Sequence, residues 1–318
     1  MGDSPGRTNI RCEVSVSSNK GLPVTIVTGY LGAGKTTLVN NALRKANGLK
    51  LAILVNEFGS LAIDEDLIIS QDENMISIAG GCVCCSYGND LLLSLMELAK
   101  LDPKPNHIIL EASGVAIPSA IETSISLIEE CYVESIVALV DAEQIRDQLS
   151  DKYVADTILA QIQSADLIFA NKIDLVKNLS DFNCWASNSP PLDSCICVSH
   201  SNIELDVLLG VKRVGESNPQ GPHINEFWSK TYIPGAPLDP KAFAKLLSGS
   251  DLKLVRTKGY VRGTDGKTYL IQTVGHRYYI DLSAELKEPG VVLIGSKSSK
   301  HESEVLERIG ELRKKSDV

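Results

Sequence analysis

The sequence has no apolar run long enough to cross a membrane, and its first residues lack the apolar core of an export signal. No hydrophobic stretch approaches the ~18 residues that a membrane-spanning helix needs. Residues 1–21 are polar and are predicted to form a flexible N-terminal tail. We therefore expect no membrane partner and a cytoplasmic location, where thiols stay reduced. The eight cysteines are then expected to be ligands, nucleophiles or core residues rather than disulfide partners.

Positive charge is also scarce. The 318 residues include 31 Lys and Arg against 40 Asp and Glu, which gives a formal net charge of -9. Such a surface repels phosphate backbones, so nucleic acid is not expected as a partner. A hydrophobic fraction of 43% in a chain of this length supports one large or two ordinary domains with a sizeable core.

Short apolar strands alternate with helical patterns through the first part of the chain. A β-branched run over Pro23–Thr28 precedes a helical pattern from Lys35 to about Lys45. Later strand-like runs include His107–Leu110 and Leu167–Ala170. This alternation predicts an α/β domain with a mostly parallel sheet that is covered on both faces.

The pattern changes after about residue 214. Residues 215–221 are rich in Gly, Pro, Ser and Asn, which is typical of a linker. Beyond them, Thr264-Asp265-Gly266 separates two strand-like runs and predicts a β-hairpin. The sequence therefore predicts a tail at 1–21, an α/β domain at 22–214, a linker at 215–221 and a small α+β domain at 222–318.

A glycine-rich turn between the first strand and the first helix fits the pattern G-x-x-x-x-G-K-[ST]. Its glycines allow successive backbone N–H groups to face a phosphate, and the helix N-terminus adds a positive dipole end. Lys35 is expected to reach the β- and γ-phosphates, and the Thr36 hydroxyl to ligate Mg²⁺. The alternative, a turn without function, is disfavoured by the flanking strand and helix. The predicted phosphate-binding residues are Gly29, Gly32, Ala33, Gly34, Lys35, Thr36 and Thr37.

A second candidate segment, Asn171-Lys172-Ile173-Asp174, follows the strand-like run that ends at Ala170. Guanine presents an N1–H and an exocyclic amine, two donors that the Asp174 carboxylate can accept together, whereas adenine presents no such pair. The position at a strand end, downstream of a phosphate loop, favours base recognition by Asn171, Lys172 and Asp174 over a solvated turn. Ser199, after another short apolar run, is a candidate for the small residue that backs the base.

The segment Glu111-Ala112-Ser113-Gly114 ends a further strand. Many P-loop enzymes carry an acidic residue near Mg²⁺ and a glycine near the γ-phosphate at this place. We therefore predict a catalytic role for Glu111, beside Lys35 and Thr36, and nucleotide binding by Gly114. The alternative is a strand-end carboxylate that caps the next helix.

Three thiols fall within four positions at Cys82-Val83-Cys84-Cys85. Gly80 and Gly81 before them allow the backbone to bend so that the sulfurs converge. Thiolates favour Zn²⁺, Cu⁺ and related ions, and three protein ligands leave a position open, which suits a site that releases its metal. A redox pair would normally show C-x-x-C. The spacing therefore predicts a metal site, with buried structural cysteines as the alternative.

In their order along the chain, these segments resemble the CobW family of P-loop GTPases. The resemblance rests on Gly29–Thr36, Asn56–Gly59 with Asp64, Gly81–Cys85, Glu111–Gly114 with Pro118, Val140–Asp141, Asn171–Asp174 and, in the second region, Arg256–Gly259.

The resemblance implies Mg²⁺-dependent GTP hydrolysis that is coupled to the handling of zinc or cobalt by Cys82, Cys84 and Cys85. It also implies that Glu57 and Asp64 lie in the segment that responds to the γ-phosphate, with Glu57 a further candidate metal ligand. Many members carry a histidine-rich stretch, whereas this chain has five dispersed histidines. A metal-storage function is therefore not expected.

We predict a GTP-hydrolysing metallochaperone that uses GTP, Mg²⁺ and Zn²⁺ or Co²⁺. It would deliver the metal, in a nucleotide-dependent way, to a metal-requiring client protein or a cofactor-assembly enzyme, with the second domain as a docking or regulatory module. Three alternatives stay open: a signalling or assembly GTPase with structural cysteines, a metal buffer that binds GTP without turnover, and a P-loop ATPase or kinase. Asp174 disfavours the last of these.

Overall fold

A computed structural model of the chain describes residues 21–46, 48–56, 75–80, 89–210, 227–296 and 300–316. The predicted linker at 215–221 and residues 1–20 of the predicted tail lie outside these ranges. Within them, no helix combines the length and the apolar character that a bilayer span requires.

The first sheet is built from the strands β1 (Leu22–Thr28), β2 (Leu51–Asn56), β3 (Met75–Gly80), β4 (His107–Glu111), β5 (Cys131–Asp141), β6 (Leu167–Asn171) and β7 (Ile196–Cys197). All neighbours are parallel, in the order β3-β2-β4-β1-β5-β6-β7. Apolar and β-branched side chains dominate, and β4 is buried at every position. Such strands suit a sheet that is covered on both faces, so the predicted parallel sheet is confirmed.

Helices cover both faces of this sheet. They are α1 (Lys35–Arg44), α2 (Asn89–Lys100), α3 (Pro118–Ile125), α4 (Ile145–Ser150), α5 (Ala155–Ser164), α6 (Leu179–Ser187) and α7 (Leu205–Leu209), with 3₁₀ turns η2 (Ile173–Leu175) and η3 (Leu192–Ser194). Helices α2 to α6 share one apolar core with the sheet. Helices α1 and α7 pack into a second core on the other face.

A second sheet follows in sequence, with strands β8 (Phe227–Tyr232), β9 (Leu254–Arg262), β10 (Thr268–Val274), β11 (Arg277–Leu282) and β12 (Gly290–Ser296). Its order is β11-β10-β9-β12-β8 and all pairs are antiparallel. Helices α8 (Pro240–Leu247) and α9 (Glu302–Ser316) share a core with it. The predicted hairpin is confirmed, since β9 pairs with β10 and Gly266 in the turn has a φ of 78°.

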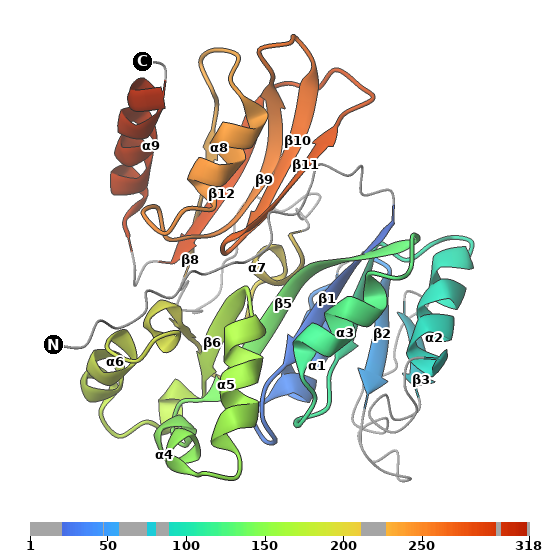
Figure 1. The fold of residues 1–318 in the computed structure, drawn as a ribbon, viewed down its shortest axis with the longest axis vertical. Coiled ribbons are helices and arrows are strands. Elements are labelled where there is room, and N and C mark those ends of the chain that lie inside the picture. Colours follow the sequence, from blue (N-terminus) through green and yellow to red (C-terminus); the bar gives the residue numbers. More distant parts are fainter. Residues whose placement is uncertain are drawn as a thin grey trace, which may run out of the picture.

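The two sheets meet at the amino ends of the parallel strands. Val255, Val274 and Ile294 of the second sheet join the core that α1 and α7 form on the first. In Figure 1 the second sheet lies beyond one end of the first, and the arrowhead of β2 points away from it. The carboxyl ends, where parallel sheets hold their ligands, therefore lie opposite the second sheet.

A buried ion pair joins the sheets at this interface. The Arg256 guanidinium of β9 lies 2.5 Å from the Glu134 carboxylate of β5, and both side chains are 2% exposed. Burial alone would raise the pKa of Glu134, but the Arg256 charge, with smaller contributions from His107 and Lys258, holds that pKa below its ordinary value. His107 of β4 lies 3.9 Å from Glu134, and burial lowers its pKa to about 4.

Candidate functional site

Four strands bring polar or glycine residues to the carboxyl edge of the parallel sheet. The glycine-rich turn follows β1, Glu111 ends β4, Asp141 ends β5 and Asn171 ends β6. Strand β1 is the middle strand of this sheet. From β1 the chain first builds the strands on one side, β2 to β4, and then crosses to the other side with β5, so the strand order reverses at β1. Such a reversal of strand order is where open parallel sheets bind ligands.

The phosphate loop ends at the N-terminus of α1. Gly32 and Gly34 have φ angles of 78° and 103°, a backbone conformation that glycine adopts without the steric cost of a Cβ. The Lys35 ammonium donates to the carbonyl of Gly29 at 2.9 Å and to that of Tyr30 at 3.4 Å. The ammonium therefore lies folded over the loop, next to the positive end of the α1 dipole.

The first turn of α1 links the loop to β4. The Thr36 hydroxyl, which is half-buried, donates to Glu111 Oε1 at 2.8 Å, and Glu111 is buried. Thr37 is exposed beside them. A hydroxyl and a carboxylate are oxygen donors of the kind that Mg²⁺ prefers, so the residues present fit that ion.

Asn171 joins the predicted base motif to the phosphate loop. Its Nδ2 donates to the Ala33 carbonyl at 2.9 Å and to Ser201 Oγ at 2.8 Å, and its Oδ1 accepts from the Ser201 backbone N–H at 2.8 Å. Ser201 Oγ in turn donates to the Gly34 carbonyl at 2.9 Å. A Cβ on Gly34 would lie 2.5 Å from Asn171 Nδ2, so only glycine permits this approach.

The rest of the base motif lies at the same edge. Lys172 has a φ of 62°, and its ammonium pairs with Asp141 at 2.8 Å. Asp174 is exposed, with its carboxylate 3.9 Å from the His200 imidazole. The geometry therefore leaves the Asp174 carboxylate accessible from solvent, while Lys172 is held by β5.

Sequence reasoning missed Ser201. Ser199, the residue predicted to back the base, is half-buried, and its carbonyl accepts the Asn202 N–H at 3.0 Å. The chain turns between them, because His200 and Ser201 both have φ angles above 50°. Positive φ is uncommon at residues other than glycine, so the turn that brings Ser201 to Asn171 was not predicted from the sequence, and the role of Ser199 beside the base stays a prediction.

The loop after β4 is held from α5. The N–H of Ala116 donates to the Ser113 carbonyl at 3.0 Å, which closes a tight turn around Gly114. Gln161 Nε2 donates to the Gly114 and Ala116 carbonyls at 3.0 and 3.1 Å. Sequence reasoning also missed Gln161, because a glutamine inside an amphipathic helix carries no local signal of its partner.

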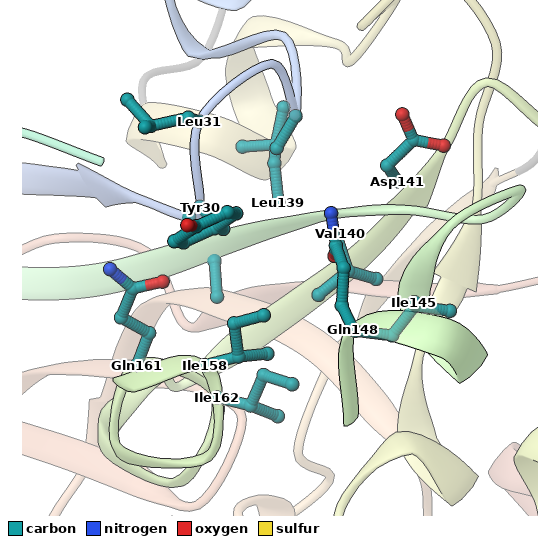
Figure 2. A pocket seen from close by; sticks show the side chains of 13 residues that line it. Tyr30, Leu31, Leu139, Val140, Asp141, Ile145, Gln148, Ile158, Gln161 and Ile162 are labelled. Carbon is teal, nitrogen blue, oxygen red and sulfur yellow. The ribbon is translucent and has the colours of Figure 1, made fainter. Parts of the chain in front are cut away.

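A small cavity lies between the phosphate loop and α5. Figure 2 shows the Tyr30 ring over Ile158 and Ile162, with Gln161 beside them and Leu31 pointing away. Its volume of ≈ 10 Å³ is about that of one water. The cavity is therefore a packing gap beneath the phosphate loop and too small for a nucleotide base.

The predicted thiolate ligands Cys82, Cys84 and Cys85 lie outside the described residues, as do Glu57 and Asp64. Within the described ranges, no group of three or more His, Cys, Asp or Glu side chains is arranged to hold a metal ion. Among the predicted site residues that the structure describes, Lys35, Thr36, Glu111 and the base motif lie at the same carboxyl edge of the parallel sheet.

A phosphate loop after the central strand of a parallel sheet, with an Asn-Lys-x-Asp segment at the same edge, defines a P-loop nucleotide-binding protein. The family model described as CobW/HypB/UreG, nucleotide-binding domain, matches residues 23–189. The chain belongs to this family, and it is a GTPase. The resemblance of its sequence segments to CobW proteins is therefore confirmed.

Individual relatives extend over much of the chain. A zinc chaperone CobW from a Sinorhizobium species is 29% identical over 312 residues, which cover 82% of this chain and 87% of that protein. The zinc chaperone YjiA from Escherichia coli is 31% identical over 195 residues, covering 59% of this chain and 60% of YjiA. A structure of a Zn(II)-bound mutant of the YjiA GTPase is 22% identical, with a TM-score of 0.43, and covers 90% of this chain and 96% of that one.

Proposed function

We propose that this GTPase binds a thiophilic metal ion through Cys82, Cys84 and Cys85 and releases it to a client in step with GTP hydrolysis. The observation that carries the proposal is the position of β3. This strand ends at Gly80, immediately before the cysteine segment, and runs parallel to the strand that holds Glu111.

The registers give the proposal a length scale. Gly80 of β3 pairs with Asn56 of β2, and Val55 of β2 pairs with Glu111 of β4. Neighbouring strands lie about 4.8 Å apart, so the backbone at Gly80 is roughly 10 Å from that of Glu111. Gly80, the last described residue before the cysteine segment, thus lies at the same edge as the nucleotide residues.

In the proposed reaction, water adds to the γ-phosphorus while the bond to the β–γ bridging oxygen breaks. GDP leaves, and the proton of the water passes to a phosphate oxygen or to solvent. Lys35 would stabilise the charge that develops on the bridging oxygen. Thr36 and Glu111 would hold Mg²⁺, which when bound neutralises charge on the β- and γ-phosphates. The Gly114 backbone N–H would donate to the γ-phosphate.

Base selection is proposed for Asp174, whose carboxylate is exposed at the edge of the sheet. Replacing Asp174 by Ala removes a charge-assisted pair with guanine, worth about 2–4 kcal/mol or roughly 30- to 1000-fold in GTP affinity. ATP affinity should change little. Equal GTP and ATP affinity in the unchanged protein would contradict guanine recognition.

Zinc is the first metal to test, because the Sinorhizobium and Escherichia coli relatives are both named zinc chaperones. Cobalt is the second, as the family resemblance implies. The partner is proposed to be a metal-requiring client protein or a cofactor-assembly enzyme.

The deciding experiment measures metal affinity in each nucleotide state. A chromophoric chelator competes for Zn²⁺ or Co²⁺ with the full-length chain, which is loaded with GDP or with a non-hydrolysable GTP analogue. We expect tighter metal binding with the analogue by about 5- to 150-fold, and reciprocity requires metal to tighten the analogue by the same factor.

The matched variants separate the cysteine segment from the other thiols. Conversion of Cys82, Cys84 and Cys85 to Ser should abolish the coupling and leave GTP binding intact. Cys184→Ser is the control, because Cys184 is an exposed thiol on α6. Equal metal affinity in both nucleotide states would instead support a signalling or assembly GTPase with structural cysteines.

A further inference from the structure

Gln161 is a buried polar side chain whose hydrogen bonds, within the described ranges, go to the loop after β4. It lies on α5, is 1% exposed, and donates from one nitrogen to two carbonyls of the loop after β4. A helix residue at this position would ordinarily be apolar, since its neighbours Ile158 and Ile162 belong to the core. The polar contact is therefore specific to the loop.

The same loop is in tight contact with the phosphate loop on its other side. A Cβ added to Gly114 would lie 2.6 Å from Leu31 Cδ2 and 2.9 Å from the Leu31 backbone nitrogen. Because backbone atoms cannot give way cheaply, Gly114 is pressed against the phosphate loop. The loop after β4 is thus held between Leu31 of the phosphate loop on one side and the Gln161 amide of α5 on the other.

Gln161 uses only its donor side. Its Oε1 is buried and has no hydrogen-bond partner within the described part of the chain. An unpaired buried acceptor is unfavourable, so this side chain is not optimised for stability of the helix. Its two N–H···O contacts nevertheless hold the carbonyls of Gly114 and Ala116. The peptide group that carries the Gly114 N–H is held within the same turn, because the Ser113 carbonyl of that group accepts the Ala116 N–H at 3.0 Å.

We propose that Gln161 is a positioning residue for GTP hydrolysis, which holds the Ser113–Ala116 turn so that the Gly114 N–H faces the γ-phosphate. The inference deepens the proposed function and rests on the role proposed there for Gly114. Gln161 contacts neither nucleotide nor Mg²⁺ in this scheme. It acts through the loop, so its loss should affect the chemical step and not the binding of GDP.

The test compares Gln161→Met with Gln148→Met in the full-length chain. Met keeps the length of the side chain and removes both donors. Gln148 is the control, because it lines the same cavity from α4 and the one hydrogen bond described for its side chain goes to Gln144 and not to the loop after β4. We expect Gln161→Met to lower kcat about 10- to 100-fold, as for a misplaced reacting group, with GDP affinity within about 2-fold of the control.

Gln161→Glu supplies a second readout that also serves if the Met variant folds poorly. An ionised carboxylate cannot donate to the two carbonyls, whereas a protonated one regains an O–H donor. The pKa of a carboxyl buried there should be raised, so the kcat of Gln161→Glu relative to wild type should rise as the pH is lowered. Gln161→Met should show no such recovery.

The outcomes are distinct. An unchanged kcat in Gln161→Met, or a kcat loss matched by an equal loss of GDP affinity, overturns the positioning role. The absence of pH-dependent recovery in Gln161→Glu also overturns it. Lys35→Ala separates this failure from that of the proposed function: phosphate release that survives Lys35→Ala refutes the phosphate-loop mechanism itself, and with it the basis for Gln161.

Discussion

The ion pair between Arg256 and Glu134 offers a direct test of how the second sheet is attached. We consider Arg256→Met, which removes the guanidinium and keeps much of the side-chain length. In the structure the guanidinium donates to Glu134 at 2.5 Å and to the carbonyls of Val207 and Leu208 at 3.3 and 3.2 Å. All three contacts are buried, so the variant leaves a carboxylate and two carbonyls without their donor.

The expected loss follows from that burial. Breaking a buried pair by removing one partner destabilises a protein by about 3–5 kcal/mol, because the remaining charge is uncompensated. Total stabilities are only about 5–15 kcal/mol, so the effect should be large. Removing both charges, in Arg256→Met with Glu134→Leu, should recover most of the loss, since no isolated charge remains.

The assay is urea unfolding, followed separately in each region. The sequence has two tryptophans, Trp185 on α6 and Trp228 on β8. Changing either one to Phe leaves a fluorescence signal from one region alone. We expect Arg256→Met to weaken the interface enough that the Trp228 and Trp185 transitions separate, whereas they should lie closer together in the double variant.

The pH dependence of the two single variants supplies the control. Without Arg256, burial should raise the folded-state pKa of Glu134 above its unfolded value. The stability of Arg256→Met relative to wild type should therefore increase as the pH falls through this raised folded-state pKa. In Glu134→Leu the guanidinium stays charged at any accessible pH, so the loss of stability relative to wild type should be nearly constant above the ordinary pKa of a glutamate and should shrink only below it. Single variants that each lose less than about 1 kcal/mol, or a double variant that loses their sum, would refute the argument.

Three further predictions concern other residues. Burial holds the pKa of His107 at about 4 against an ordinary 6.5, so as the pH falls the unfolded chain takes up a proton before the folded protein does. The contribution of neutral His107 to the free energy of unfolding should therefore be fully present above pH 6.5 and fall by up to about 3 kcal/mol between pH 6.5 and 4. Urea titrations of His107→Gln should show a smaller loss of stability over this pH range. Lys35→Ala should lower phosphate release about 100-fold or more with an unchanged far-ultraviolet circular dichroism spectrum, and near-normal turnover would contradict the role given to the ammonium. Asn171→Ala removes three buried hydrogen bonds, one to the Ala33 carbonyl of the phosphate loop and two to Ser201, whose hydroxyl bonds the Gly34 carbonyl. Affinities for GTP and GDP should therefore fall together by about 10-fold in a fluorescent-nucleotide titration, and a loss confined to GTP would contradict that network.

The second sheet also holds the helix that follows the Gly114 loop. Arg277 of β11 pairs with Glu122 on α3 at 2.7 Å and with Asp166 before β6 at 3.2 Å. The Tyr279 hydroxyl donates to the Val133 carbonyl at 2.6 Å. These contacts, with Arg256, tie the second sheet to the starts of β5 and β6 and to α3, so buried polar contacts as well as apolar packing join the two sheets.

Much of the fold was accessible from the sequence because its signals are local. Buried parallel strands require continuous apolar runs, which is why β1, β4 and β6 were predicted with nearly their observed bounds. The phosphate loop was predictable for a similar reason, since its glycines, lysine and threonine all act within eight consecutive positions. The hairpin at Thr264–Gly266 likewise depends on the backbone preferences of its own residues.

Contacts between distant segments belong to the tertiary structure. Asn171 meets Ala33 across 138 positions, and Arg256 meets Glu134 across 122. Such pairs depend on the order of the strands and on the docking of the second sheet, which no local pattern encodes. Gln161 and Ser201 were missed for the same reason: a buried amide and a serine at positive φ look ordinary in sequence, and they gain their roles only when folding brings the loop after β4 or the phosphate loop against them.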